Sequence, residues 1–314
     1  MTAPAIATLL VFAALACGAA AGVLVMHVAL PATRHRAWST LGPRTRAALL
    51  RHARLAPLTG GLVFVVLVQL AFWLFEPANQ RESSGIVLPA LASAGLWIVL
   101  SVARRAWLGV RATRALTAAW RASLVQPAQV PGWSGEAWAI ESAFPVVAVT
   151  GVRRARLFVS RAVLSTCTPD ELAVIAAHER AHLAAHDNRS RLLFLLAPGA
   201  CGAAAQLERL WNDAAEEIAD LQARAAGDGV TLARALLKVA RLALGPVPTP
   251  CLASALIGGD TLEQRVRRLM APVQPAGRSL HAAAALLALP AVAVAFAALP
   301  VVYDAAEALV HLGR

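Results

Sequence analysis

Three histidines, His178, His182 and His186, follow one another at intervals of four residues inside the segment PDELAVIAAHERAHLAAHDN. On an α-helix, residues four apart lie on one face, so His178 and His182 can direct their imidazoles at a single metal ion. Glu179 completes an H-E-x-x-H motif, and from that position a glutamate can act as general base on a water polarised by zinc. His186 would lie about 12 Å along the helix from His178, so we expect it to be exposed or to support the site rather than to bind the same ion.

A third ligand has to come from another segment, and the best candidate is Glu216 in NDAAEEIADLQAR. Its carboxylate would complete a site of two histidines and one glutamate, with the fourth position left to water. Asp220 follows one helical turn later on the same face and can accept a hydrogen bond from the free ring nitrogen of a liganding histidine. Glu217 is the alternative ligand. Because it points about 100° away from Glu216, only one of the two should face the metal.

Each of these motifs also has an ordinary structural explanation. H-E-x-x-H fixes only three positions and arises by chance, and EEIAD is typical of a solvated helix face. The combination favours the metal site, because the histidines lie in a segment with strong helix-start signals. Thr168 can cap the helix, Pro169 suits its first position, and Glu171 completes a capping box. These signals predict a helix from Pro169 to about His186.

The rest of the chain is too apolar for an ordinary soluble domain. It has 314 residues, of which 58% are hydrophobic and 15% charged, and its mean hydropathy is +0.61. Four segments are nearly free of charge and long enough to cross a hydrocarbon core of about 30 Å as helices. They are Ala5–Leu30, Leu58–Phe75, Ile86–Ala103 and Leu280–Val302.

The arginines cluster on one side of these predicted spans. The formal net charge is +11, and residues 31–57 carry six arginines without an acidic residue. Five more follow the third span in residues 104–124, again without an acid. This positive-inside pattern predicts an external N-terminus, cytoplasmic residues 31–57 and 104–279, and an external C-terminal tail. It also makes a nucleic-acid surface a poor explanation of the charge.

Two other classes fit the sequence poorly. No Lys or Arg precedes the first apolar run, which weakens a cleaved signal peptide as the interpretation of residues 1–25. The four cysteines at 17, 167, 201 and 251 are widely separated and show no C-x-x-C spacing. The sequence therefore indicates neither a thiolate zinc site nor a disulfide framework.

The predicted cytoplasmic segment contains short helices and one small β element. Residues 104–124 fit either an amphipathic helix along the membrane surface or a continuation of the third span. Residues 126–135 read as a linker, and PVVAVT and RLFVS as a small strand pair. Arg191–Ala205 is apolar over too short a length to span comfortably and predicts a buried hairpin or a re-entrant element. Helices are predicted at Gln206–Ala225, at Thr231–Leu244 and in TLEQRVRRLM.

We therefore predict a mainly α-helical, polytopic membrane protein with about four transmembrane helices. Its cytoplasmic part should be a zincin-like metallopeptidase segment that contains a small β element. Residues 1–103 would form three transmembrane helices with a basic cytoplasmic loop, and residues 104–279 a membrane-associated peptidase domain. Residues 280–314 would form the last transmembrane helix and a short external tail.

TPDELAVIAAHERAHLAAHDN, together with EEIAD downstream, resembles the membrane-embedded zinc metallopeptidases of the M56 family. That group contains the peptidase domains of bacterial β-lactam sensor-transducers. The segment is also similar to the M48 family of HtpX-like and CAAX-prenyl proteases, which shares the H-E-x-x-H, an aspartate five residues on and a downstream E-x-x-x-D. The resemblance is close only from Pro145 to about Ala225. Three spans before the catalytic segment and one after it favour M56.

The resemblance implies one zinc ion per chain. The implied ligands are His178, His182 and Glu216, the implied catalytic base is Glu179, and the implied supporting residues are Asp187 and Asp220.

The activity implied is that of a membrane zinc endopeptidase that cleaves a protein substrate at the cytoplasmic face. The substrate would be a cytoplasmic repressor in signalling, or a misfolded or membrane-bound protein in M48-type quality control. The expected partners are this substrate and the lipid bilayer, with no nucleic acid. Because the chain ends at Arg314, we expect no extracellular penicillin-binding sensor. The rival is a catalytically silent membrane regulator, against which the intact H-E-x-x-H and Glu216 argue.

Overall fold

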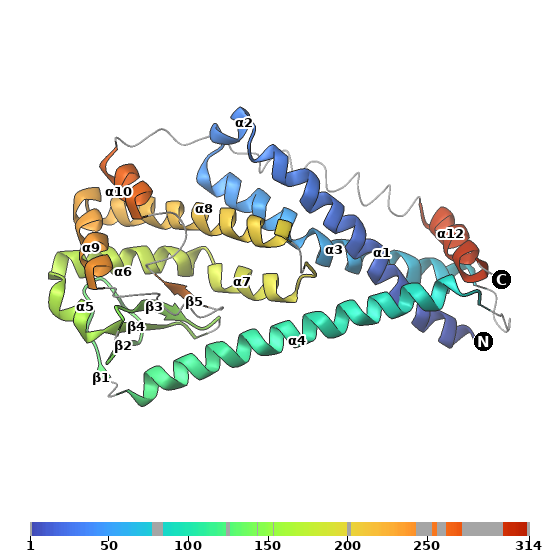
Figure 1. Ribbon diagram of the computed structural model, residues 1–314, viewed down its shortest axis with the longest axis horizontal. Coiled ribbons are helices and arrows are strands. Elements are labelled where there is room, and N and C mark those ends of the chain that lie inside the picture. The colour runs from blue at the N-terminus through green and yellow to red at the C-terminus, as the bar shows by residue number, and fades with distance from the viewer. Residues whose placement is uncertain are drawn as a thin grey trace.

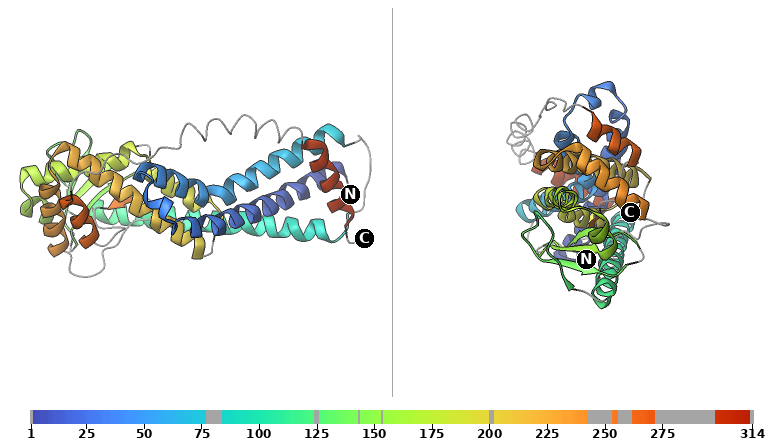
Figure 2. Two further views of the ribbon diagram at one scale, coloured as in Figure 1. Left: turned by 90° about the horizontal axis from the view of Figure 1, so that it is seen from above. Right: turned by 90° about the vertical axis from the view of Figure 1, so that its left-hand side faces the viewer.

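Three long helices carry the apolar segments of the N-terminal part of the chain. The structure, a computed structural model, describes residues 2–76, 84–123, 126–142, 144–152, 154–199, 202–242, 253–255, 262–271 and 298–312. Helix α1 spans Ala3–Ala32, α2 Arg36–Ser39, α3 Pro43–Phe75 and α4 Val87–Ala122. Helices α1, α3 and α4 are long and apolar enough to cross a membrane, as predicted. They form an elongated bundle that extends away from the sheet, and both termini lie at its far end (Figure 1; Figure 2).

Glycines let α1 and α3 pack backbone against backbone. A Cβ atom at Gly18 would collide with the carbonyl of Gly60, and one at Gly22 would collide with the carbonyl of Ala56. Small residues at such crossings are typical of helices that associate in lipid, where close packing replaces the hydrophobic effect as the driving force. This contact fixes the part of α3 that leads toward the segment with the H-E-x-x-H motif.

Helix α4 resolves the two interpretations of residues 104–124. It runs without interruption from the apolar segment through Arg104 and Arg105 to Ala122, so the basic stretch continues the third span. At about 1.5 Å per residue, a helix of 36 residues is about 54 Å long, well beyond the membrane core. Its last turns reach the sheet, where Trp120 packs against Phe158 with ring centroids 5.5 Å apart.

The predicted fourth span, Leu280–Val302, lies mostly outside the described residues. Helix α12, Leu299–His311, begins within its last residues. Val310 of this helix packs against Ile6 of α1 and Phe72 of α3. The described C-terminal helix therefore lies beside the membrane helices (Figure 1).

A five-stranded sheet follows α4, where the sequence predicts a strand pair. The strands are β1 Gln126–Pro127, β2 Ala137–Ile140, β3 Val147–Thr150, β4 Arg156–Ser160 and β5 Ala253–Ala255, in the order β1-β2-β4-β3-β5. The predicted pair is confirmed as β3 and β4, which are antiparallel. Strand β2 is parallel to β4, and its other neighbour, β1, lies inside the predicted linker 126–135. The sequence pattern missed both strands, because β1 has only two residues and AWAI contains a single β-branched residue.

The two faces of the sheet carry two different cores. Alternate residues of a strand point to opposite faces. Val147 and Val149 of β3 join a core with α6 and α9, whereas Ala148 joins Trp120 of α4. The sheet is therefore held between the end of α4 and the helices that carry the H-E-x-x-H motif.

The remaining described helices surround that motif. They are α5 Arg161–Thr166, α6 Pro169–Ala184, α7 Asp187–Leu196, α8 Gly202–Ala226, α9 Gly229–Leu242 and α10 Leu262–Met270. The helices predicted at 206–225, at 231–244 and in TLEQRVRRLM are confirmed as α8, α9 and α10. The predicted hairpin at 191–205 contains the end of α7, Pro198 and Gly199 outside any helix, and the start of α8. Gly199 has φ +139°, a conformation that favours glycine.

Candidate metal centre

Helix α6 is fixed at its start by the predicted capping box. The Glu171 backbone N–H donates to Thr168 Oγ1 at 3.3 Å, and the Thr168 N–H donates to Glu171 Oε2 at 2.8 Å. Lys238 of α9 also donates to Glu171 Oε2 at 2.7 Å. Burial alone would raise the pKa of Glu171, but these bonds from Lys238 and Thr168 hold it below its ordinary value. The ionised carboxylate thus ties α9 to the start of the helix that carries the histidines.

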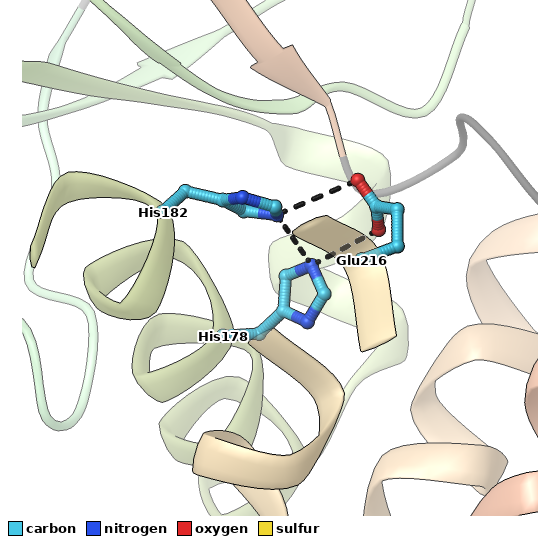
Figure 3. Close-up of side chains that lie close together, drawn as sticks. All are labelled: His178, His182 and Glu216. Atoms are coloured by element: carbon cyan, nitrogen blue, oxygen red, sulfur yellow. Dashed lines mark hydrogen bonds and ion pairs between the residues drawn. The ribbon is translucent and has the colours of Figure 1, made fainter. Parts of the chain in front are cut away.

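His178, His182 and Glu216 converge on one point between α6 and α8. Each offers one ligand atom, and these atoms all lie within 4.8 Å of one another. His178 Nε2 lies 3.1 Å from His182 Nε2 and 3.4 Å from Glu216 Oε2, and His182 Nε2 lies 3.5 Å from Glu216 Oε1 (Figure 3). All three side chains are buried. The structure therefore brings together the three residues that the sequence singled out as ligands.

The outer ring nitrogens show which atoms face the common point. His182 Nδ1 lies 2.7 Å from Asp187 Oδ2, and His178 Nδ1 lies 3.1 Å from Asp220 Oδ1. An ionised carboxylate only accepts hydrogen bonds, so a neutral His182 ring carries its proton on Nδ1, which is hydrogen-bonded to Asp187. In His178 the nearby Asp220 carboxylate favours the same tautomer, although Nδ1 makes no hydrogen bond of good geometry. Both Nε2 atoms then present lone pairs to each other and to Glu216. Buried lone pairs that face one another are unfavourable unless a cation lies between them, so the donor set fits a metal ion.

Glu216 and Glu217 point in different directions, as their spacing predicts. Glu216 faces the two histidines, whereas Glu217 accepts hydrogen bonds from Arg46 Nη2 of α3, at 2.7 Å to Oε2. Arg268 Nη1 of α10 lies 3.7 Å from the same oxygen. The structure therefore favours Glu216 over the alternative ligand. Glu217 instead connects α8 to a membrane helix.

The helix that carries His178 and His182 ends before it reaches His186. Helix α6 stops at Ala184, two residues before the predicted end, and His186 has a left-handed backbone with φ 56°. His186 is exposed, in agreement with the expectation that it does not bind the same ion. The sharp turn at His186 starts α7 at Asp187 and so returns the Asp187 carboxylate to His182.

Glu179 lies on α6 directly beside His178 and is fully buried, with 0% of its surface exposed. Position 179 is rotated about 100° around the helix from position 178. Its charge contributes to the raised pKa of Arg265, after Glu216 and Asp220. The candidate general base therefore lies in the same buried electrostatic environment as the ligands.

Arg265 of α10 is part of the site, although the sequence predicted only that it lies on a short helix. It is 2% exposed and donates to both carboxylate oxygens of Asp220, from Nη2 at 2.7 Å and from Nε at 3.1 Å. Its Nη1 lies 3.0 Å from Glu216 Oε2. A signal was present in TLEQRVRRLM, because Arg265 occupies the same helix face as Leu262 and Leu269. An arginine on the apolar face of an amphipathic helix needs a buried acid to pair with.

The acids of the site favour positive charge at the histidines. Burial by itself lowers the pKa of His182, but the carboxylates of Glu216 and Asp187 raise it to about 10. Burial likewise opposes ionisation of Glu216, yet His182, His178 and Arg265 hold its pKa well below the ordinary value. The two acids around His182 therefore stabilise either protonated imidazole or a bound cation in the same place.

One family model matches the segment that holds this geometry. Residues 123–243 match the model described as Peptidase family M48. The matched range runs from the end of α4 through α9 and includes β1 to β4 and every predicted ligand. This segment is therefore similar to M48 peptidase domains, and metal-dependent hydrolysis of peptide bonds is the chemistry that this family implies. No curated protein and no solved structure matches the chain.

Proposed function

We propose that this chain is a membrane-embedded zinc endopeptidase of the M48 type, with one zinc ion per chain and its active site at the cytoplasmic face. The observation that carries the proposal is the convergence of two Nε2 atoms and a glutamate carboxylate within 4.8 Å. This convergence occurs in a helix whose sequence is H-E-x-x-H, inside the segment that matches the M48 model.

The donor set favours zinc over harder cations. Two imidazoles and one carboxylate are typical of catalytic zinc sites, whereas calcium and magnesium prefer oxygen ligands. His178, His182 and Glu216 would hold the ion, and Asp220 and Asp187 would orient the two rings through their Nδ1 atoms. When bound, a zinc ion at such a site lowers the pKa of a coordinated water and polarises the carbonyl of the scissile bond.

Glu179 is the proposed general base. It would accept the proton of the attacking water and return it to the amine that leaves when the peptide bond breaks. A carboxylate suits this exchange because it can accept a proton from water and then donate the same proton to the amine. Arg265 is already bonded to Asp220 and Glu216, so its proposed part is to keep these two acids ionised and in place.

The proposed topology follows the arginines. With residues 31–57 and 104–279 on the cytoplasmic side, Arg46 and Arg54 on α3 and Arg105 on α4 lie between the apolar spans and the peptidase domain. Each of them contacts α7 or α8. The substrate would then be a protein that reaches the site from the cytoplasm or from the inner leaflet.

The M48 match and the M56 resemblance predict different classes of substrate. Quality control predicts cleavage of unfolded or membrane-bound proteins, and the M48 match favours it. Regulated proteolysis of a cytoplasmic repressor is favoured only by the M56-like order of three spans before the catalytic segment. Proteomic comparison of cells with the wild type and with Glu179→Gln separates them: many stabilised membrane proteins support the first, and one stabilised DNA-binding repressor supports the second.

The first experiment is zinc content and peptide release in detergent-purified protein. Wild type should bind near one zinc per chain and cleave an unfolded substrate such as casein. Glu179→Gln, a nearly isosteric change, should keep its zinc and lose cleavage. Equal cleavage by both proteins would reject Glu179 as the base. Zinc binding with no cleavage by wild type on any substrate would favour the catalytically silent regulator instead.

A further inference from the structure

Arg54 is a buried cation that the proposed chemistry does not use. It lies on α3 and is 1% exposed. Its Nη2 donates to the carbonyl of Phe194 at 2.9 Å and its Nη1 to the carbonyl of Pro198 at 3.2 Å. Its Nε donates to Glu208 Oε1 of α8 at 2.6 Å. A single side chain of a membrane helix thus reaches both the end of α7 and the start of α8.

Arg105 reaches the same end of α7 from α4. It donates to the carbonyl of Leu195, from Nη2 at 3.0 Å and from Nε at 3.2 Å, and also to the carbonyl of Ala197. The helices are close here, because a Cβ atom at Gly109 of α4 would lie 2.8 Å from Leu195 Cδ1. We call the two arginines, Arg54 and Arg105, and the carbonyls that they contact the arginine clamp. These carbonyls belong to Phe194, Leu195, Ala197 and Pro198.

The clamp supplies hydrogen-bond donors to carbonyls at the C-terminal end of α7 that have no partner within the helix. The last four carbonyls of an α-helix have no partner within the helix, and at the end of α7 Pro198 has no N–H to supply one. Cations at a helix C-terminus are also favoured by the helix dipole. Gly199, which follows Pro198, has φ +139°, and a Cβ atom there would lie 3.1 Å from Ala204 Cβ. The C-terminal end of α7 is thereby fixed to two membrane helices.

The opposite end of α7 holds the metal site. The helix begins at Asp187, whose Oδ2 lies 2.7 Å from His182 Nδ1. It has 10 residues, and so is about 15 Å long. A helix this short behaves as a rigid rod, so a shift of its C-terminal end moves Asp187 relative to His182.

We propose that Arg54 and Arg105 are positioning residues. By fixing the end of α7 to α3 and α4, they set the position of Asp187 against His182, and the packing of the membrane helices thereby controls the affinity of the metal site. The inference rests on the proposed function, because it requires a metal ion at His182. It adds to that function a route by which a change in the membrane helices alters the peptidase site.

The test is a double-mutant cycle on zinc affinity in the full-length protein in detergent. Zinc dissociation constants are measured by competition with a chromophoric chelator for Arg54→Gln, Arg105→Gln, Asp187→Asn and the two doubles with Asp187→Asn. Loss of a partner of a metal-binding histidine weakens affinity by about 10–100-fold, so we expect about tenfold from either arginine variant and more from Asp187→Asn. Each double should match Asp187→Asn alone within about twofold, because the arginines act through Asp187.

The controls separate positioning from general destabilisation. Arg104→Gln removes the same charge from the neighbouring, exposed position of α4 and should leave zinc affinity unchanged. Glu208→Gln breaks the ion pair to α8 and keeps both arginines on α7, so it should have little effect. If Arg54→Gln does not fold, Arg105→Gln and Arg54→Lys complete the cycle.

Three results overturn the inference. Unchanged affinity in the folded arginine variants removes the link to the site. Effects that multiply in the doubles show that the arginines do not act through Asp187. Absence of zinc from the wild type overturns the proposed function and this inference together, whereas normal zinc binding with multiplying effects overturns the inference alone.

Discussion

The metal centre and the arginine clamp are both buried and charged, but their polar atoms face different partners. In the clamp, guanidinium donors of Arg54 and Arg105 meet backbone carbonyls, so each hydrogen bond pairs a donor with an acceptor. In the metal centre, two acceptors face each other, since His178 Nε2 lies 3.1 Å from His182 Nε2 while both Nδ1 atoms face carboxylates. The clamp is complete without an added cation, whereas the metal centre needs either a bound ion or an additional proton on an imidazole.

This difference shows what distinguishes an ion site from a structural polar network. Burial and charge are common to both regions, and so is the participation of α7. What separates them is the convergence of acceptor atoms on one point. Removing a ligand should therefore abolish binding of an ion, whereas removing a clamp residue should only displace an element.

The largest expected effect comes from the third ligand. Glu216→Ala should reduce zinc to background and lower peptide cleavage by more than about 100-fold, beyond the range for partners of a ligand. Glu217→Ala is the matched control, because it removes the neighbouring carboxylate, which pairs with Arg46 instead. Zinc analysis by mass spectrometry checks both variants. Retention of zinc by Glu216→Ala, or its loss in Glu217→Ala, would reverse the assignment of the ligand.

A smaller but still large effect is expected at Arg265, which contacts both Glu216 and Asp220. Arg265→Met leaves two buried acids without this partner, and breaking a buried ion pair in this way costs about 3–5 kcal/mol of the free energy of unfolding. Zinc should offset part of the loss, so the variant should depend more on bound metal than the wild type does. Thermal unfolding with and without a chelator measures this. Arg267→Met, which removes an exposed pair with Glu263, should change stability by less than about 1 kcal/mol.

Local sequence pattern was sufficient to predict which residues converge at the candidate metal centre. His178 and His182 lie on one helix face because they are four residues apart, and the capping box at Thr168 and Glu171 marks the start of that helix. Glu216 and Asp220 follow the same rule. These predictions need only the geometry of a single helix, and the three long apolar helices need only length and composition.

The parts that the sequence missed depend on segments far apart in the chain. Arg54 contacts carbonyls about 140 residues later, and Arg265 contacts an aspartate 45 residues earlier, so neither partner is visible in a local window. Strand β5 likewise joins β3 across about 100 residues. From the sequence, the C-terminal end of α7 was predicted only as part of an apolar hairpin or re-entrant element. The arginines that contact its carbonyls lie on α3 and α4, far away in the sequence. An arginine within an otherwise apolar helix face was the signal available for both residues.

A moderate effect is expected from the carboxylate behind His178. Asp220→Asn keeps the shape of the side chain but removes the charge that faces His178 Nδ1 at 3.1 Å. Zinc affinity should fall by about 10–100-fold, the usual effect of losing such a partner. Competition with a chelator measures the change. Arg105→Gln combined with Asp220→Asn should multiply the two effects, because Asp220 lies on α8 and the clamp acts through α7. A double variant no weaker than Asp220→Asn would contradict this separation of the two routes.

The smallest effect is expected at Glu171 of the capping box. Its carboxylate anchors the start of α6 and is not a proposed metal ligand. The folded pKa of Glu171 lies below its unfolded value of about 4.3, so its ionised form stabilises the fold. This contribution is present at pH values above about 4.3 and is lost as the pH falls through the lower, folded pKa. Glu171→Gln should therefore cost about 1 kcal/mol near pH 7 and nothing once the wild-type carboxylate is protonated. Unfolding of both proteins across this pH range checks the prediction, and Asp170→Asn in the same helical turn is the control. A difference that does not shrink toward acid would mean that the shape of Glu171, rather than its charge, anchors the helix.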